Sequence, residues 1–227
     1  MKKIFSLLLL SFLVFGNSYA QSSETRDVND FTGVSFGVAG ELILEQGNSF
    51  SVVLEGDKDD LEEVETLVRG DMLIIRQDSW LNWGNKKVTV YITMPVIDDL
   101  SVSGSGNLIA EKIKADDLEI SVSGSGDIDL GELVANSVDC SISGSGTIEI
   151  GEGTAGDGEL SISGSGKYRG DEFALKYLDV SISGSGSCYT MVEEKLEAHI
   201  SGSGNVYYSG SPNVDAKVSG SGKVRKR

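Results

Sequence analysis

Seven carboxylates recur along the second half of the chain, 20 residues apart at first and 18 apart towards the end. We call them the acid column: Asp99, Glu119, Asp139, Glu159, Asp179, Glu197 and Asp215. If equivalent positions stack on neighbouring strands, these side chains stand about 4.8 Å apart, and each pair repels by roughly 0.9 kcal/mol in water. Ca²⁺ would relieve the repulsion, because hard cations take carboxylate oxygens as ligands. The alternative is a solvated acidic stripe with no ordered ion, and no other metal or cofactor is predicted.

Aromatic side chains form the second set of candidates. Exposed rings can stack on sugar rings or anchor a protein partner, whereas the alternative for each is local packing. The candidate ligand-binding residues are Trp80 and Trp83, in a predicted loop, and Tyr189, Tyr207 and Tyr208. The single histidine, His199, has no Ser-His-Asp arrangement around it. We therefore predict no catalytic residue and no enzyme.

These candidates are positioned by a repeat. The residues Ser-Gly-Ser-Gly occur seven times, starting at Ser103, Ser123, Ser143, Ser163, Ser183, Ser201 and Ser219. A fixed period of this length is typical of stacked repeats. The residue before every motif is valine or isoleucine, and apolar residues also stand three before and five after its first serine. Apolar residues at every second position predict strands with one buried face.

The predicted fold is therefore all-β, a parallel β-helix or solenoid with rungs of about 20 residues. Each rung consists of a strand, a Ser-Gly-Ser-Gly corner, a second strand and a return segment. Glycine suits the corner because it reaches positive φ and lets neighbouring backbone approach closely. We expect a right-handed coil, following the general rule for parallel crossovers. The acid column and the serines two before each motif face outward.

The change of spacing from 20 to 18 preserves the alternation, because removing two residues keeps every later side chain on its own face. We expect the deletion in the return segment. The two cysteines, Cys140 and Cys188, then point inward two rungs apart. That separation is about 10 Å, too far for a disulfide, so we predict two buried free thiols.

Three segments are expected along the chain. Residues 1–20 have a basic start at Lys2 and Lys3, an apolar run and a small-x-small cleavage site at Ser18-Tyr19-Ala20, which together indicate a signal peptide. Residues 21–97 lack the motif but alternate, and read as a β-rich segment that continues and caps the solenoid, with a helical turn near Lys58–Glu65. Residues 98–227 are the repeat. The mature chain is expected to have no transmembrane segment, because no second apolar run occurs in it.

The chain is acidic, with a net charge of −16. A phosphate backbone would be repelled by such a surface, so nucleic acid is excluded as a partner. The basic run at the C-terminus, Lys223 to Arg227, is expected to protect the last strand from end-to-end stacking. The alternative interpretation of this run is a docking tag.

The chain resembles the family of putative auto-transporter adhesin head domains, called head GIN domains. The resemblance lies in Phe31-Thr32-Gly33-Val34, the Leu73-Ile74-Ile75 strand, Val90-Tyr91-Ile92-Thr93-Met94-Pro95 and the seven corners. It implies a β-solenoid exported by Gram-negative bacteria, with adhesion suggested by the family's name, and it carries no catalytic residues.

We therefore expect an exported, non-catalytic adhesin or envelope interaction module in the periplasm, at the cell surface or outside the cell. Its partner would be an extracellular or envelope protein or glycan, bound by the outer face and loops. Two alternatives remain open. One is a β-helix enzyme acting on polysaccharide, and the other is a subunit of a self-assembling extracellular fibre.

Overall fold

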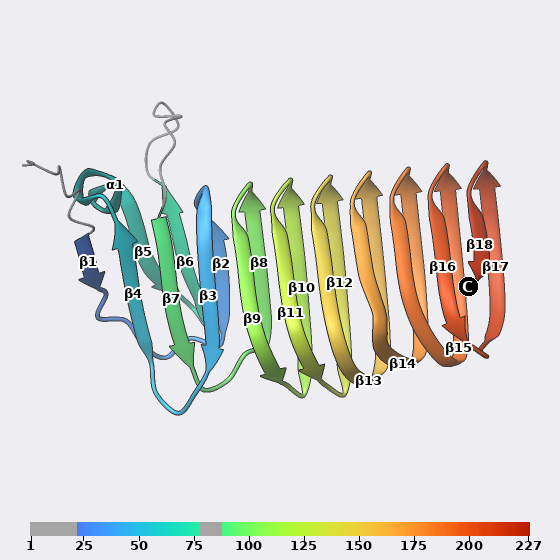
Figure 1. The fold of residues 1–227 in the computed structure, drawn as a ribbon, viewed down its shortest axis with the longest axis horizontal. Helices are drawn as coiled ribbons and strands as arrows, with labels where there is room; N and C mark the ends of the chain where they lie inside the picture. Colours follow the sequence, from blue (N-terminus) through green and yellow to red (C-terminus); the bar gives the residue numbers. More distant parts are fainter. Residues whose placement is uncertain (1–21, 78–87) are drawn as a thin grey trace, which may run out of the picture.

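The computed structural model describes residues 22–77 and 88–227, and most of these residues lie in β-strands. From residue 99 onward the strands form successive rungs of one solenoid, which lie side by side from green to red in Figure 1. Strands pair in parallel with the equivalent strand of the next rung, which confirms the predicted β-solenoid. The strands are β8 (Asp99–Gly104), β9 (Asn107–Lys114), β10 (Asp117–Gly124), β11 (Asp127–Val134), β12 (Ser137–Gly144), β13 (Thr147–Gly164), β14 (Lys167–Gly184), β15 (Ser187–Gly202), β16 (Asn205–Gly210), β17 (Asn213–Gly220) and β18 (Lys223–Lys226).

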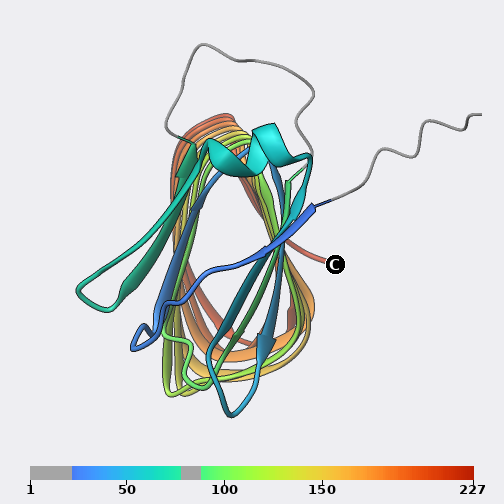
Figure 2. The same ribbon diagram turned by 90° about the vertical axis from the view of Figure 1, so that its left-hand side faces the viewer.

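The rungs superimpose on one closed outline when the molecule is viewed along the solenoid axis (Figure 2). Each residue before a corner points into this outline and stacks on its equivalent, as Ile142 does on Val122 and Ile162. These three side chains are at most 1% exposed. Because the same positions recur in rung after rung, a single continuous apolar core runs along the solenoid.

The corners depend on glycine, as predicted. The first glycine of each motif has positive φ, for example 123° at Gly124 and 129° at Gly144. Residues with a side chain rarely adopt this backbone conformation, and from Gly124 onward the preceding rung also leaves no space for a Cβ. The amide of Ser145 donates to the carbonyl oxygen of Gly124 at 2.8 Å, which joins successive corners.

The change of period falls in the return segment, as expected. Strands β14 and β15 pair at an offset of 20 residues up to Gly170 and Thr190, and at an offset of 18 from Tyr177 and Lys195 onward. The register shifts between these two pairs. An even number of residues is lost, so inward columns before and after the shift remain inward.

Residues 22–77 and 88–97 extend both faces of the solenoid and close its first end. Their strands are β1 (Ser22–Thr25), β2 (Gly33–Gly37), β3 (Gly40–Gln46), β4 (Ser51–Gly56), β5 (Val64–Arg69), β6 (Met72–Gln77) and β7 (Val88–Met94). The predicted helical turn is α1 (Lys58–Glu62), which lies at the end of the solenoid that faces the viewer in Figure 2. It is shorter than expected, because Val64 already begins β5. Leu61 of this helix is fully buried.

The rungs of this N-terminal region do not follow chain order. Strands β2 and β3 pair with β8 and β9, the first strands of the repeat, and pair on their other side with β6 and β7. The earlier segment therefore lies between two later ones. Beyond them, β4 and β5 pair antiparallel with β7 and β6, and β1 pairs antiparallel with β4.

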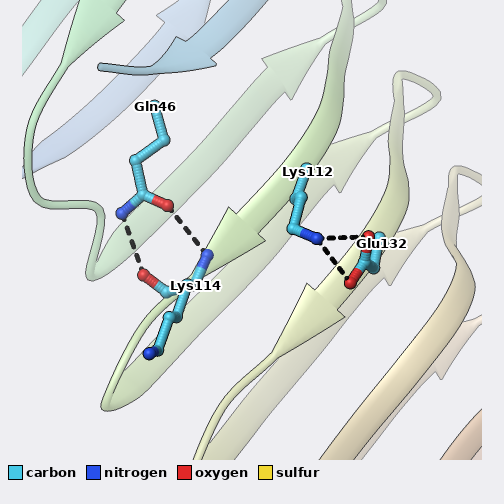
Figure 3. Close-up of polar contacts among 4 residues, drawn as sticks. All are labelled: Gln46, Lys112, Lys114 and Glu132. Atoms are coloured by element: carbon cyan, nitrogen blue, oxygen red, sulfur yellow. Dashed lines mark hydrogen bonds and ion pairs between the residues drawn. The ribbon is translucent and has the colours of Figure 1, made fainter.

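Gln46 joins this region to the repeat. Its side-chain amide donates to the carbonyl oxygen of Lys114 at 2.9 Å, and its Oε1 accepts from the amide of Lys114 at 2.8 Å (Figure 3). On the same strand as Lys114, Lys112 forms an ion pair with Glu132 of the next rung at 2.7 Å (Figure 3). The glutamine side chain thus serves as a short extension of β3 alongside the end of β9.

Both cysteines are buried and free, as predicted. Burial raises the pKa of each thiol strongly above its usual value. The buried side chain of Tyr168 lies near both thiols. Tyr168 is the register partner of Cys188 on the neighbouring strand, and it also lies near Cys140 in the core. The thiols therefore behave as small apolar core residues.

Candidate binding surfaces

The acid column is aligned as the repeat predicts. Successive members are register partners from Asp99 with Glu119 to Glu197 with Asp215. Five of the seven side chains are exposed, whereas Asp99 and Glu197 are half-buried. The column therefore forms a continuous line of carboxylates on the outer face of one sheet.

The two half-buried members have opposite environments. Partial burial, together with the neighbouring carboxylates of Glu119 and Asp98, raises the pKa of Asp99 to about 6. A hydrogen bond and ion pair from Lys195 lower the pKa of Glu197. The carboxyl group of Asp99, at the first rung, is therefore protonated more readily. The ionised carboxylate of Glu197, near the other end of the column, is stabilised.

Calcium binding at the acid column stays a prediction. Within residues 22–77 and 88–227, no three His, Cys, Asp or Glu side chains gather closely enough to hold a metal ion. A column with one carboxylate per rung offers each ion few oxygens, whereas Ca²⁺ takes six to eight. Water molecules would have to complete the coordination shell of any ion bound here.

Beside the acid column run two outward columns. The first positions of the motifs are all serine, and the positions two before them are serine except for His199 and Lys217. Ser121 Oγ donates to Ser101 Oγ at 3.0 Å, so hydroxyls of one column bond along the solenoid. Towards the C-terminal end the two columns line a shallow groove of about 540 Å³. We call it the hydroxyl groove, and its polar side chains are Ser161, Ser163, Ser181, Ser183, His199, Ser201, Lys217 and Ser219.

The tyrosines lie on the opposite sheet. Tyr189 and Tyr207 share an outward column and stack, with ring centroids 5.0 Å apart and planes inclined by 15°. Arg227 lies over the ring of Tyr189 at 5.5 Å and forms an ion pair with Asp171. The end of the chain thus occupies one face of this pair, which favours local packing. Tyr208 is half-buried against the core.

Sequence reasoning missed a second groove on the tyrosine-bearing sheet. It measures about 380 Å³ and its lining includes Asp129, Glu149, Lys167 and Arg169. Arg169 and Glu149 form an ion pair across successive rungs at 3.6 Å. These mixed charges stand at the first and third positions after each corner, so aligning those two outward columns in the sequence reveals them. Trp80 and Trp83 lie outside the described residues, as does the predicted signal peptide.

Together, a β-solenoid with rigid, flat outer columns and shallow grooves defines a class of repeat proteins that present extended surfaces. The family of the putative auto-transporter adhesin, head GIN domain, matches residues 30–212, and the chain belongs to this family. No curated protein matches the chain. In the described part of the chain, no helix is long and apolar enough to cross a membrane.

Solved structures share the fold at low sequence identity. A putative adhesin from Bacteroides fragilis NCTC 9343 has a TM-score of 0.84 and 22% identity, covering 92% of this chain and 98% of that one. A putative adhesin from Parabacteroides merdae ATCC 43184 has a TM-score of 0.73 and 24% identity, covering 93% and 98%. A putative lipid binding protein from Parabacteroides distasonis ATCC 8503 has a TM-score of 0.73 and 23% identity, with coverage of 93% and 98%.

Proposed function

We propose that this protein is an exported, non-catalytic adhesin of the cell envelope that binds a glycan in the hydroxyl groove. Export rests on the signal peptide expected in residues 1–20. The adhesin role rests on family membership and on a surface built for extended contact. The observation that carries the proposal is the groove itself, where serine hydroxyls, His199 and Lys217 converge on one open surface.

The chemistry of the groove suits a sugar polymer. Serine hydroxyls donate and accept hydrogen bonds, as sugar hydroxyls do, and strand pairing repeats them about every 4.8 Å along the axis. The short side chains stand on a rigid sheet, so little conformational entropy is lost on binding. At one end of the groove Lys217 adds a positive charge and His199 adds a polar ring, which suits a neutral or weakly acidic glycan.

The test is a glycan array probed with the purified protein, with Ca²⁺ and with chelator. The Ser181→Leu variant should lose binding because leucine fills the groove, whereas Ser141→Leu should retain it. Ser141 occupies the same outward column but does not line the groove. Equal binding by both variants would mean that the glycan binds outside the hydroxyl groove. Release of free sugar from a glycan by the purified protein would indicate an enzyme instead. Binding lost on chelation would assign a role to the acid column.

A further inference from the structure

The two ends of the solenoid core differ. At the N-terminal end, Leu61 of α1 and Leu54 of β4 are fully buried. At the C-terminal end, Val218 is 42% exposed, although Ile200, its equivalent one rung earlier, is 2% exposed. Ala216 is exposed as well, whereas Ala198 is fully buried. Apolar side chains that are buried in the earlier rungs are therefore exposed in the last one.

The backbone of this rung is also open. Strand β17 pairs with β15, and β18 pairs with β16. Among the described residues no strand pairs with the other edge of either. An exposed strand edge is a template for one more strand, because its outward amide and carbonyl groups need partners.

The charge of the rung selects the partner. Residues 213–227 contain one acid, Asp215, and five basic residues, whereas the whole chain has a net charge of −16. Arg227 is held by Asp171 and Tyr189, but Lys217, Lys223, Arg225 and Lys226 are exposed. Two copies joined through this edge would bring two basic β18 strands together, so charge disfavours a second copy and favours an acidic segment.

We propose that β18, at the open edge of the last rung, binds an extended acidic segment of a partner protein, which adds to the sheet as the next strand. Apolar residues at alternate positions of that segment would cover Val224 and face the open core in which Val218 is exposed. Its carboxylates would face Lys223 and Arg225. The proposal does not rest on the glycan function. It concerns a different ligand and a different strand, because β17 lines the hydroxyl groove through Lys217 and Ser219 whereas no residue of β18 does.

The test uses fluorescence anisotropy with the purified protein at physiological salt and a fluorescein-labelled peptide, Ser-Val-Glu-Val-Glu-Val-Glu-Val-Ser. Saturable binding is expected, at least tenfold weaker for the Lys223→Glu/Arg225→Glu double variant and for Val224→Asp. Ser181→Leu, which blocks the hydroxyl groove, should bind the peptide normally, so failure of the glycan function and failure of this docking edge can be told apart.

Two controls keep the proposal falsifiable. A peptide of the same composition with its valines and glutamates in separate blocks should bind at least tenfold more weakly, since it cannot present the two faces of a strand. Equal affinity for both peptides would reduce the interaction to unspecific charge attraction and overturn the proposal. A concentration-dependent dimer in sedimentation experiments, with no peptide binding, would overturn it in favour of a second copy.

Discussion

The side-chain amide of Gln46 exchanges two hydrogen bonds with the backbone of Lys114, 68 residues later in the chain. The glutamine thereby supplies the partners that an additional strand residue would otherwise provide. It also donates to the carbonyl oxygen of Pro95 at 3.3 Å. A single side chain therefore connects the N-terminal strands, the link to the repeat and the first rung.

Replacing this amide should loosen the junction. We expect Gln46→Ala to lower the free energy of unfolding by about 0.5–1.5 kcal/mol, because it removes hydrogen bonds to a backbone that water can reach. The exposed neighbour provides the control, since Glu45→Ala should change stability by less than about 0.5 kcal/mol. Urea denaturation measures both, and equal effects would argue against a special role for Gln46.

The corner glycines should be intolerant of any side chain. At Gly144 a Cβ would overlap the carbonyl oxygen of Gly124, and φ is 129°. Gly70 also has positive φ but has open space around it. Gly70→Ala should therefore cost about 1–2 kcal/mol for backbone strain alone, and Gly144→Ala should cost clearly more. Thermal unfolding compares the two, and similar losses would show that the rungs can separate locally.

The in/out assignment of the strands can be tested at adjacent residues. Ile162 is 1% exposed in the core, whereas Ser161 beside it faces solvent. Ile162→Ala should cost about 2–5 kcal/mol through cavity formation, and Ser161→Ala should cost little. Chemical denaturation of the two variants decides the point, and equal losses would contradict the assignment.

Asp99 predicts a pH-dependent stability. Its pKa is raised from 3.8 to about 6 in the folded protein, so folding favours the protonated carboxyl. Stability from this group is fully present below pH 3.8 and is lost as the pH rises through about 6. Asp99→Asn, which stays neutral, should raise the melting temperature at pH 7.5 and much less at pH 4.5.

The control for this pH dependence is Asp179→Asn, at an exposed position in the same column. Its melting temperature should follow that of the unmodified protein at both pH values. An Asp99→Asn gain that is the same at pH 4.5 and 7.5 would rule out titration of this carboxyl as the cause.

The two thiols should be inert in the folded protein. Cys140 and Cys188 are buried, and burial raises the pKa of both, so neither a path for reagent nor a reactive thiolate is available. Ellman's reagent should detect almost no thiol in native buffer and two per chain in guanidinium chloride. Fast reaction of the native protein would mean that the rungs open near Tyr168.

The sequence alone determined the repeat solenoid in some detail. The in/out face of Ile162, the positive φ of Gly144, the alignment of the acid column and the free state of Cys140 all followed from local rules. Each rung repeats the same short pattern, and a period of two residues assigns every side chain to a face. Equivalent rungs can then stack only in register without exposing their apolar columns.

The tertiary structure decided what lies at the two ends. Residues 33–46 form the rung next to the repeat although residues 72–94 follow them in sequence, and Gln46 meets Lys114 only because of this order. At the other end, Arg227 turns back over Tyr189 and Val218 is left open. These contacts join segments with no shared pattern, so they depend on long-range packing, which alternation along the chain does not encode.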